Sequence, residues 1–295
     1  MVKCPNCQHS TALVFTVVDR NRHITDQVFD YYRCPSCQVV FLAPIPENLS
    51  DYYQDEYYAL PVTVDDLQPS LPDQRYKIDL LRPFKPGGSL LEIGPAAGSF
   101  AYLALQAGYH VEVIEMDQAC CKFISEKLSI RAICSADPAS ALDDLGQYDV
   151  IALWHVIEHL PSPWDVLPAL ADHLSPGGIL VIAAPNPRAF QFRILRQFWT
   201  HLDAPRHLEL IPADTLKASL NQVGLKSVFE TTTDRGGLGW NTFGWKISLH
   251  NLVKDQSLKR LMRGMGLVLT LVFAPIERND MFGSAYTLVF QKGAK

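Results

Sequence analysis

Four of the seven cysteines stand in two short pairs, Cys4-Pro-Asn-Cys7 and Cys34-Pro-Ser-Cys37. A C-x2-C turn presents two thiolates from one side, and two such turns supply the four ligands of a tetrahedral Zn²⁺ ion. The alternative is a pair of disulfides. The stretch MVKCPNC has no apolar signal region, so we expect a cytoplasmic, reducing location, in which metal binding is favoured. The sequence therefore predicts a structural zinc site with Cys4, Cys7, Cys34 and Cys37 as its ligands.

The 26 residues between the two pairs can hold a hairpin, with TALVFTVVD and ITDQVFDYYR as its strands. A ribbon this small buries too little core to fold alone, so bound metal would supply its folding energy. We place the zinc ribbon at residues 1–45. Residues 46–74 follow as a Tyr-rich segment and a proline-containing, mobile linker.

A second stretch that could do chemistry is LLEIGPAAGSF, a short apolar strand followed by a turn of small residues. Small residues let the backbone approach a ligand closely, and the helix that follows offers free N–H groups. The stretch fails the dinucleotide pattern G-x-G-x-x-G, because Ala96 and Ser99 occupy the positions of the second and third glycines. A nicotinamide oxidoreductase is therefore disfavoured.

Acidic residues follow the next two predicted strands. Glu115 comes 21 residues after Gly94, where a carboxylate can accept hydrogen bonds from both hydroxyls of a ribose. Asp137 follows the third strand, where it could accept a hydrogen bond from an adenine amine. Each residue also has a structural alternative: a solvated carboxylate at a strand end for Glu115, and the N-cap of a helix for Asp137.

These candidate residues need a scaffold, and the chain supplies one from Arg75 onward, where apolar strands alternate with helices. That alternation is typical of an α/β fold, with helices on both faces of a doubly wound, mostly parallel sheet. The seven predicted strands are 89–93, 110–115, 131–134, 148–154, 179–184, 226–232 and 285–291.

The composition of the chain excludes several classes of protein. With 48% hydrophobic residues and a mean hydropathy of +0.03, the chain is too apolar for a disordered protein. No apolar run approaches the roughly 20 residues that cross a bilayer. The net charge is −5, which argues against a nucleic-acid partner, because binding to phosphate backbones usually requires a basic excess.

Several of these motifs together resemble a known family. They are LLEIGPAAGSF, the strand end VIE, Ala136-Asp137, YDVIALWHVIEHL, LSPGGILVIAAPN and the segment Asp203-Ala-Pro-Arg-His207-Leu. With them the chain resembles the class I S-adenosylmethionine-dependent methyltransferases. The cysteine pairs, CQVVFLAPIP and DYYQDEYY are similar to a bacterial group of these enzymes that carries an N-terminal zinc ribbon. Ala96 departs from the family, which often has a glycine there.

The resemblance implies a Rossmann-like methyltransferase domain at residues 75–295, with a helical, substrate-side insertion at 236–282 before the last strand. It implies S-adenosylmethionine as cofactor, with Glu92, Gly94 and Gly98 around the methionine, Glu115 on the ribose, and Ala136 and Asp137 beside the adenine. The full set of expected cofactor-binding residues is Glu92, Gly94, Ala96, Gly98, Phe100, Glu115, Met116, Ala136, Asp137, Trp154 and His155.

Histidines are the candidate catalytic residues. Methyl transfer is mostly a matter of positioning, and a base is needed only when the acceptor carries a proton of high pKa. We rank His155 first, since it follows the fourth strand and has an ordinary pKa of about 6.5, and then His207 and His201. The string HVIEH matches the H-x-x-E-H pattern of inverted zinc proteases, but a strand before it and prolines after it leave room for a single turn only. Whether a second divalent ion binds this loop, as related quinone-type O-methyltransferases suggest, stays open.

The insertion contains GGLGWNTFGW, which suits a mobile wall over an apolar substrate, and an apolar helix at 257–274 that is basic at its start. That helix could pack in the core, act as a lid, or contact a membrane or a lipid-linked substrate. The predicted activity is methyl transfer to a small-molecule hydroxyl on a natural product, quinone-like compound, sugar or lipid-linked glycan. The alternatives are an RNA or protein methyltransferase that uses the ribbon to bind its substrate, and a non-catalytic cofactor-binding protein.

Overall fold

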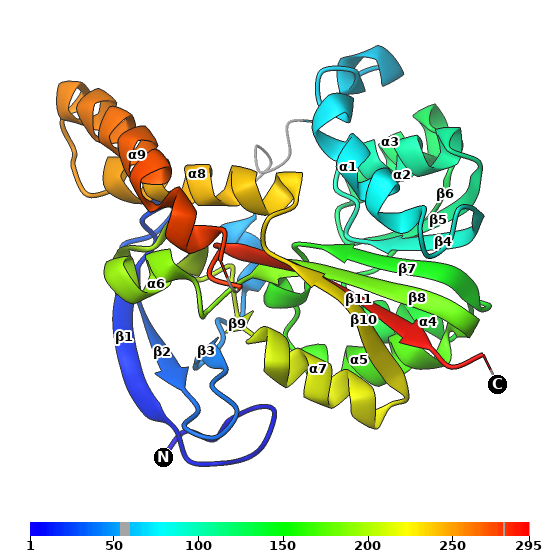
Figure 1. Cartoon of the computed structure of the whole chain (residues 1–295), viewed down its shortest axis with the longest axis horizontal. Helices are drawn as coiled ribbons and strands as arrows, with labels where there is room; N and C mark the ends of the chain where they lie inside the picture. Colours follow the sequence, from blue (N-terminus) through cyan, green and yellow to red (C-terminus); the bar gives the residue numbers. More distant parts are fainter. Residues whose placement is uncertain (54–59, 280, 295) are drawn as a thin grey trace.

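The computed structural model describes residues 1–53, 60–279 and 281–294. Its centre is a seven-stranded sheet in the order β10-β11-β8-β7-β4-β5-β6 (Figure 1). Strand β11 is antiparallel to both of its neighbours, and the other paired strands run parallel. The strands are β4 (Gly88–Ile93), β5 (Tyr109–Glu115), β6 (Arg131–Cys134), β7 (Tyr148–Trp154), β8 (Leu174–Pro185), β10 (Leu225–Thr231) and β11 (Ala285–Lys292). The predicted mostly parallel sheet of seven strands is confirmed.

Helices cover both faces of this sheet, as Figure 1 shows. On one face lie α1 (Leu71–Leu81), α2 (Ser99–Gln106) and α3 (Gln118–Lys127); on the other lie α4 (Pro138–Leu142), α5 (Pro163–Asp172) and α7 (Ala213–Gln222). Side chains alternate between the two cores: in β7, Ile151 and Leu153 point to one face and Val150 and Ala152 to the other. A strand buried on both faces must be apolar throughout, which is why YDVIALW was recognisable from its sequence.

The cysteine-rich segment forms a second sheet, in the order β1-β2-β3-β9. Its strands are β1 (Ala12–Val18), β2 (Val28–Arg33), β3 (Val40–Leu42) and β9 (Glu209–Leu210). The predicted hairpin is β1–β2. Strand β9, however, comes from the segment that follows β8, and Val39 and Phe41 enter the same hydrophobic cluster as the large sheet. The ribbon is therefore built into the rest of the fold through a shared sheet and a shared core.

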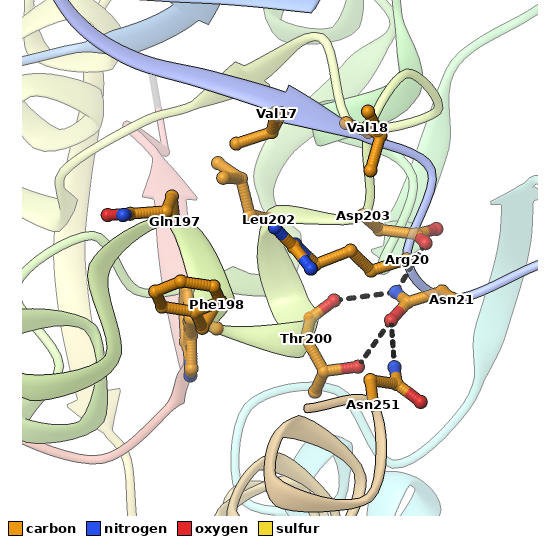
Figure 2. A pocket seen from close by; sticks show the side chains of 12 residues that line it. Val17, Val18, Arg20, Asn21, Gln197, Phe198, Thr200, Leu202, Asp203 and Asn251 are labelled. Carbon is orange, nitrogen blue, oxygen red and sulfur yellow. Dashed lines mark hydrogen bonds between the residues drawn. The ribbon is translucent and has the colours of Figure 1, made fainter. Parts of the chain in front are cut away.

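A buried arginine joins the ribbon to the DAPRH segment. The Arg206 side chain has no exposed surface, and its Nη1 and Nη2 donate to the Asp19 carboxylate at 3.1 and 2.8 Å. Its Nε and Nη2 also donate to Asp203, at 3.0 and 2.7 Å. Figure 2 shows the adjoining contacts, in which Asn21 of the ribbon is hydrogen-bonded to Thr200 and Asn251. Asp19 therefore ties the ribbon to the segment that carries His201 and His207.

Two helices form the insertion, α8 (Arg235–His250) and α9 (Gln256–Glu277), which pair as a hairpin at one end of the molecule (Figure 1). The stretch GGLGWNTFGW, predicted as a mobile wall, lies inside α8, which is capped by the Asp234 side chain at the Gly237 N–H. Gly244 serves close packing, because a Cβ there would lie 2.0 Å from Oε1 of Gln191. No helix in the described ranges is both long and apolar enough to cross a membrane.

Shorter elements complete the chain, namely η1 (Leu49–Tyr52), η2 (Val64–Leu67), η3 (Ile157–His159), α6 (Phe190–Leu195), η4 (Arg196–Phe198) and η5 (Thr200–Leu202). Two of them change the interpretation of the predicted linker at 46–74. Its described part contains η1, η2 and the start of α1, and Leu67 packs into the core on the α1 face of the sheet. The segment is therefore part of the packed fold where the structure describes it.

Removing the Arg206 side chain should destabilise the fold strongly. The Arg206→Ala variant leaves two carboxylates without their cation, and breaking one partner of a buried ion pair typically costs about 3–5 kcal/mol. The free energy of unfolding from denaturant titration measures this loss. Arg235→Ala, which removes an exposed ion pair with Asp73, is the matched control and should change stability by less than about 1 kcal/mol. Equal effects of the two variants would contradict this role of Arg206.

Candidate functional site

A cavity of about 460 Å³ opens where β4, β5 and β7 end. From β4 the chain continues to β5, its neighbour on one side, whereas β7 pairs with β4 on the other side. The strand order therefore reverses at β4, and parallel sheets bind ligands at the strand ends beside such a reversal. The volume falls in the usual range for a small-molecule site. Of the expected cofactor-binding residues, those that line the cavity are Gly94, Ala96, Glu115, Met116, Ala136, Trp154 and His155.

The turn after β4 takes unusual backbone angles. Gly94, Ala96 and Gly98 all have positive φ, at +67°, +51° and +77°. A Cβ at Gly94 would lie 2.6 Å from Cγ2 of Val156, so this position requires glycine. Ala96 has no such freedom, and a left-handed alanine costs on the order of 1–2 kcal/mol. Its N–H donates to Oε2 of Glu115 at 2.9 Å, which helps to hold the strained turn.

Glu115 is 1% exposed, which rules out the alternative of a solvated strand-end carboxylate. Its Oε1 accepts from the N–H of Asp117 and its Oε2 from that of Ala96, both at 2.9 Å. Burial raises the pKa of this carboxyl group, and the two backbone N–H groups partly oppose that rise. A carboxylate oxygen has more than one lone pair, so each oxygen can accept a further hydrogen bond from the cavity.

Glu92, Gly98 and Phe100 do not line the cavity. Gly98 caps α2, and the Phe100 ring packs against the Trp154 ring at 5.4 Å. Glu92 is 3% exposed, and its Oε2 has no hydrogen-bond partner among the described residues. Burial raises the pKa of Glu92, with the nearby Lys77 charge opposing the rise. The Lys77 ammonium lies 4.7 Å from the centre of the Trp154 ring, which lines the cavity.

Asp137 takes the capping role that was its structural alternative. Its carboxylate accepts from the N–H groups of Ala139 and Ser140 and from the Ser140 hydroxyl, and these bonds lower its pKa. The side chain is exposed and does not line the cavity, which is bounded there by Ser135, Ala136 and Pro138. At the end of β6, contacts with a ligand in the cavity would therefore come from Ser135, Ala136 and Pro138 and not from the Asp137 side chain.

The three candidate histidines lie in different surroundings, and only His155 lines the cavity. It has a φ of +58°, and its ring packs on Trp240 at 4.6 Å. Burial and the Lys77 charge lower the pKa of His155 to about 3, so the expected ordinary pKa is wrong and the imidazole is neutral. His201 packs between Trp199 and Trp240, and burial lowers its pKa to about 4. His207 lies behind His159, with ring centroids 4.6 Å apart.

A cluster of acceptor groups lies beside the cavity. Glu158 is 1% exposed, and neither carboxylate oxygen has a hydrogen-bond partner among the described residues. Ligand atoms of Glu158, His159 and His207 lie within 4.8 Å of one another, and Nδ1 of His155 is 3.4 Å from Oε1 of Glu158. The Nδ1 atoms of His159 and His207 each donate to a backbone carbonyl, that of Arg206 at 3.0 Å and that of His201 at 2.8 Å.

Since a carbonyl can only accept, these two bonds place the protons on Nδ1 and leave both Nε2 lone pairs available. Glu158, His159 and His207 could therefore hold a divalent ion or a shared proton. The H-x-x-E-H pattern occupies only the three-residue turn η3 and the residues before it, as expected from the flanking strand and prolines.

The sequence did not reveal one wall of the cavity. Glu47, Leu49, Ser50 and Tyr53, all from the predicted Tyr-rich segment, line it. The Tyr53 hydroxyl lies 2.9 Å from Nδ1 of His159. Of the other tyrosines of DYYQDEYY, Tyr52 is buried in the hydrophobic cluster of the ribbon, and those at 57 and 58 lie outside the described residues. The only available signal was the density of tyrosines next to the ribbon, which gives no information about what they contact.

The four ribbon cysteines come together as the spacing predicts. The Sγ atoms of Cys4 and Cys37, and of Cys7 and Cys34, are 3.4 Å apart, and those of Cys7 and Cys37 are 3.7 Å apart. Four sulfurs about 2.3 Å from a tetrahedral zinc ion would be about 3.8 Å from one another. In both turns the fifth residue is a glutamine with positive φ, at +61° and +64°. The donor set fits a single Zn²⁺ ion.

Comparison with known proteins adds two kinds of finding. A family model described as a methyltransferase domain matches residues 73–229. Among curated proteins, the ubiquinone biosynthesis O-methyltransferase of Bordetella avium is 28% identical over 153 residues, which cover 48% of this chain and 63% of that one. The enzyme of the same name from Ruegeria pomeroyi is 29% identical over 180 residues, covering 57% and 69%. The chain thus spans about two thirds of the length of these relatives.

Solved structures show the same fold. An S-adenosylmethionine-dependent methyltransferase from Archaeoglobus fulgidus matches with a TM-score of 0.53 at 20% identity, over 76% of this chain and 94% of that one. A putative sarcosine dimethylglycine methyltransferase from Galdieria sulphuraria matches with a TM-score of 0.50 at 13% identity, over 84% and 100%. At these identities the likeness concerns the arrangement of strands and helices.

Proposed function

The chain belongs to the methyltransferase-domain family, and on that premise we propose that it transfers a methyl group from S-adenosylmethionine to an oxygen of a small-molecule acceptor. The observation that carries this proposal is the cavity at the ends of β4, β5 and β7, which joins the small-residue turn, Glu115 and His155. The names of the curated relatives support oxygen as the acceptor atom.

The residues of the cavity fit the proposed cofactor. Both oxygens of Glu115 keep lone pairs for ribose hydroxyls, the turn at Gly94 and Ala96 brings backbone close to the ligand, and Ala136 and Met116 border the expected adenine. When bound, the cofactor supplies a methyl group on a sulfonium, which needs no further activation. The chain then has to bring an acceptor oxygen into line with that methyl group.

We propose His155 as the residue that positions the acceptor. It is neutral, borders the cavity and is held against Trp240, so it can accept a hydrogen bond from the acceptor hydroxyl. That hydroxyl becomes far more acidic as it gains the methyl group, so even a weak base can take its proton. His201 and His207 stand back from the cavity, and we assign them no contact with substrate. The acceptor remains a hydroxyl compound of the quinone-like, natural-product, sugar or lipid-linked glycan class.

The second candidate function, methylation of RNA or protein through the ribbon, has less support. The ribbon is packed on the domain through Asp19 and β9 and shares a core with it, and the net charge is −5. A non-catalytic cofactor-binding protein would bind the cofactor without turnover on any acceptor. Extract incubated with the protein and deuteromethyl-labelled S-adenosylmethionine, followed by mass spectrometry, tests this, because a labelled small molecule appears only if the proposal holds.

Replacing His155 tests its role in that assay. His155→Ala should lower turnover by about 10²–10⁴, the usual contribution of a positioned proton acceptor, while cofactor affinity changes little. His155→Gln keeps a hydrogen-bond acceptor, so partial recovery would indicate positioning. His173→Ala, on the distant end of α5, is the control and should retain full activity. Near-wild-type turnover in both His155 variants would remove the residue from the mechanism.

Glu115→Ala should weaken cofactor binding by about 1.5–3 kcal/mol, the scale of hydrogen bonds to a charged group. Because Glu115 also holds the N–H of the strained Ala96, the variant should lose some stability as well. Calorimetric titration with S-adenosylmethionine measures the affinity, and Glu126→Ala, exposed on α3, is the control. Unchanged affinity in a folded Glu115 variant would place the ribose elsewhere.

We propose that the ribbon holds one structural Zn²⁺ ion, because its four cysteine sulfurs lie within 4.8 Å of one another, and that the protein is cytoplasmic. Cys4→Ser should therefore lose one equivalent of zinc relative to wild type and unfold the ribbon, because metal binding supplies much of its folding energy. Metal analysis by mass spectrometry measures the loss. Cys134→Ser, which alters an exposed thiol on β6, should leave zinc unchanged. Equal zinc in both variants would contradict the site.

We further propose that α9 contacts an anionic lipid surface, where a lipid-linked acceptor would be found. Core packing accounts for only one side of α9, where Leu269 and Phe273 pack against the hydrophobic cluster that contains Trp245. Another side of α9 exposes apolar residues, and its first turns carry cations. The exposed apolar residues are Leu258, Leu261, Met265, Leu267, Val268, Leu271, Val272 and Ile276, and the cations are Lys259, Arg260 and Arg263.

Flotation with vesicles of phosphatidylcholine and phosphatidylglycerol checks this surface. Wild-type protein should float with the vesicles, and the double variant Leu271→Asp, Val272→Asp should not, because charge on the apolar face opposes insertion. Val62→Asp, at an exposed valine outside the helix, is the control. A stable dimer that covers α9, seen by sedimentation and lost in the double variant, would contradict the lipid proposal.

A further inference from the structure

A second cavity, of about 580 Å³, lies between the ribbon and the segment that follows β8. Strand β2 contributes Arg33 to its wall, the connection after β8 contributes Arg188, and α6 with its C-terminal end contributes Arg193 and Arg196. Four of the 26 basic side chains of an acidic protein thus meet in one cavity. The cavity shares no lining residue with the one at the ends of β4, β5 and β7.

These arginines are short of anionic partners. Within the described ranges only Arg188 has an ion pair, with Asp214, and that pair is exposed. Arg193 lies over the Phe282 ring and Arg196 over the Phe15 ring. The buried Nε of Arg33 has no hydrogen-bond partner in the part of the chain that the structure describes. Burial, together with the charges of Arg188, Arg193 and Arg196, lowers the pKa of Arg33. Four like charges brought this close repel one another unless an anion joins them.

The rest of the wall is apolar and aromatic. The Phe15 and Phe192 rings meet edge to face at 5.6 Å, and Val14 and Val40 also line the cavity. The volume falls in the range of cavities that hold a whole small molecule and is far larger than one phosphate group needs. Guanidinium groups bind phosphate oxygens in pairs and with defined geometry. A ligand that matches this wall has a multiply charged phosphate end and an apolar or planar remainder.

We propose that this cavity is a binding site for a diphosphate-bearing small molecule of the nucleoside diphosphate type, with Arg33, Arg188, Arg193 and Arg196 on the phosphates and Phe15 and Phe192 on the planar part. The ribbon then has a binding role as well as a structural one, because β1, β2 and β3 supply one side of the cavity. The site is independent of the proposed methyl transfer, since no residue of the cofactor cavity takes part.

Calorimetric titration of the full-length, zinc-loaded protein with uridine diphosphate, adenosine diphosphate and inorganic diphosphate tests the site. At least one nucleotide should bind more tightly than inorganic diphosphate, since only the nucleotides reach the phenylalanines. The double variant Arg193→Ala, Arg196→Ala should weaken binding at least about tenfold, from the loss of charge-assisted hydrogen bonds. Both side chains are exposed, so the fold should survive. Arg33→Gln, which keeps a polar group on β2, should weaken binding as well.

Arg131→Ala removes an exposed arginine on the edge strand β6 that does not line this cavity, and it should leave nucleotide affinity unchanged. The proposal is overturned if none of the three compounds binds at millimolar concentration. It is also overturned if the double variant binds as well as wild type. A single-stranded oligonucleotide that binds wild type and displaces the nucleotides, at physiological salt, would show instead that the arginines serve a nucleic acid.

Discussion

The structure depends on one buried cation. Arg206 is fully enclosed between Asp19 of the ribbon and Asp203 of its own segment, and the two carboxylates raise its pKa against the effect of burial. Its backbone carbonyl accepts the hydrogen bond from His159, and the next residue is His207. A guanidinium with a single carboxylate would recover less of its desolvation cost. Attachment of the ribbon and placement of the histidines beside the main cavity are therefore set by the same interaction.

At the turn after β4, one side chain serves both the stability of the backbone and the proposed binding of the cofactor. Glu115 accepts the N–H of the left-handed Ala96, so the carboxylate proposed to hold a ribose also holds the strained backbone that would face the ligand. His155, at the end of β7, has positive φ as well. Two strand ends thus keep costly backbone angles around one cavity, and the packed sheet beneath them offsets the cost. Such strained backbone is expected at a functional site, where the position of the side chains matters more than the stability of the fold.

The ribbon packs against the large sheet on one side and lines a cavity on the other. Strand β9 extends the ribbon sheet, Phe41 enters the main core, and Tyr53, just after the ribbon, reaches His159 beside the main cavity. On its other side the ribbon forms a wall of the arginine-lined cavity. The ribbon thus lines the arginine-lined cavity, and the segment that follows it lines the main cavity. Neither supplies a residue that we propose to take part in the chemistry.

The sequence alone determined whatever depends on neighbours along the chain. The seven strands, the ribbon hairpin, the cysteine turns and the capping alternative for Asp137 follow from periodicity, spacing and propensity within a few residues. Only the tertiary structure decided the contacts between distant segments. It set the burial of His201 against Trp240, the grouping of Glu158 with His207, the lowered pKa of His155, the approach of Tyr53 and the meeting of the four arginines. Each of these depends on desolvation and on partners that lie tens to hundreds of residues away, and no local pattern encodes that information.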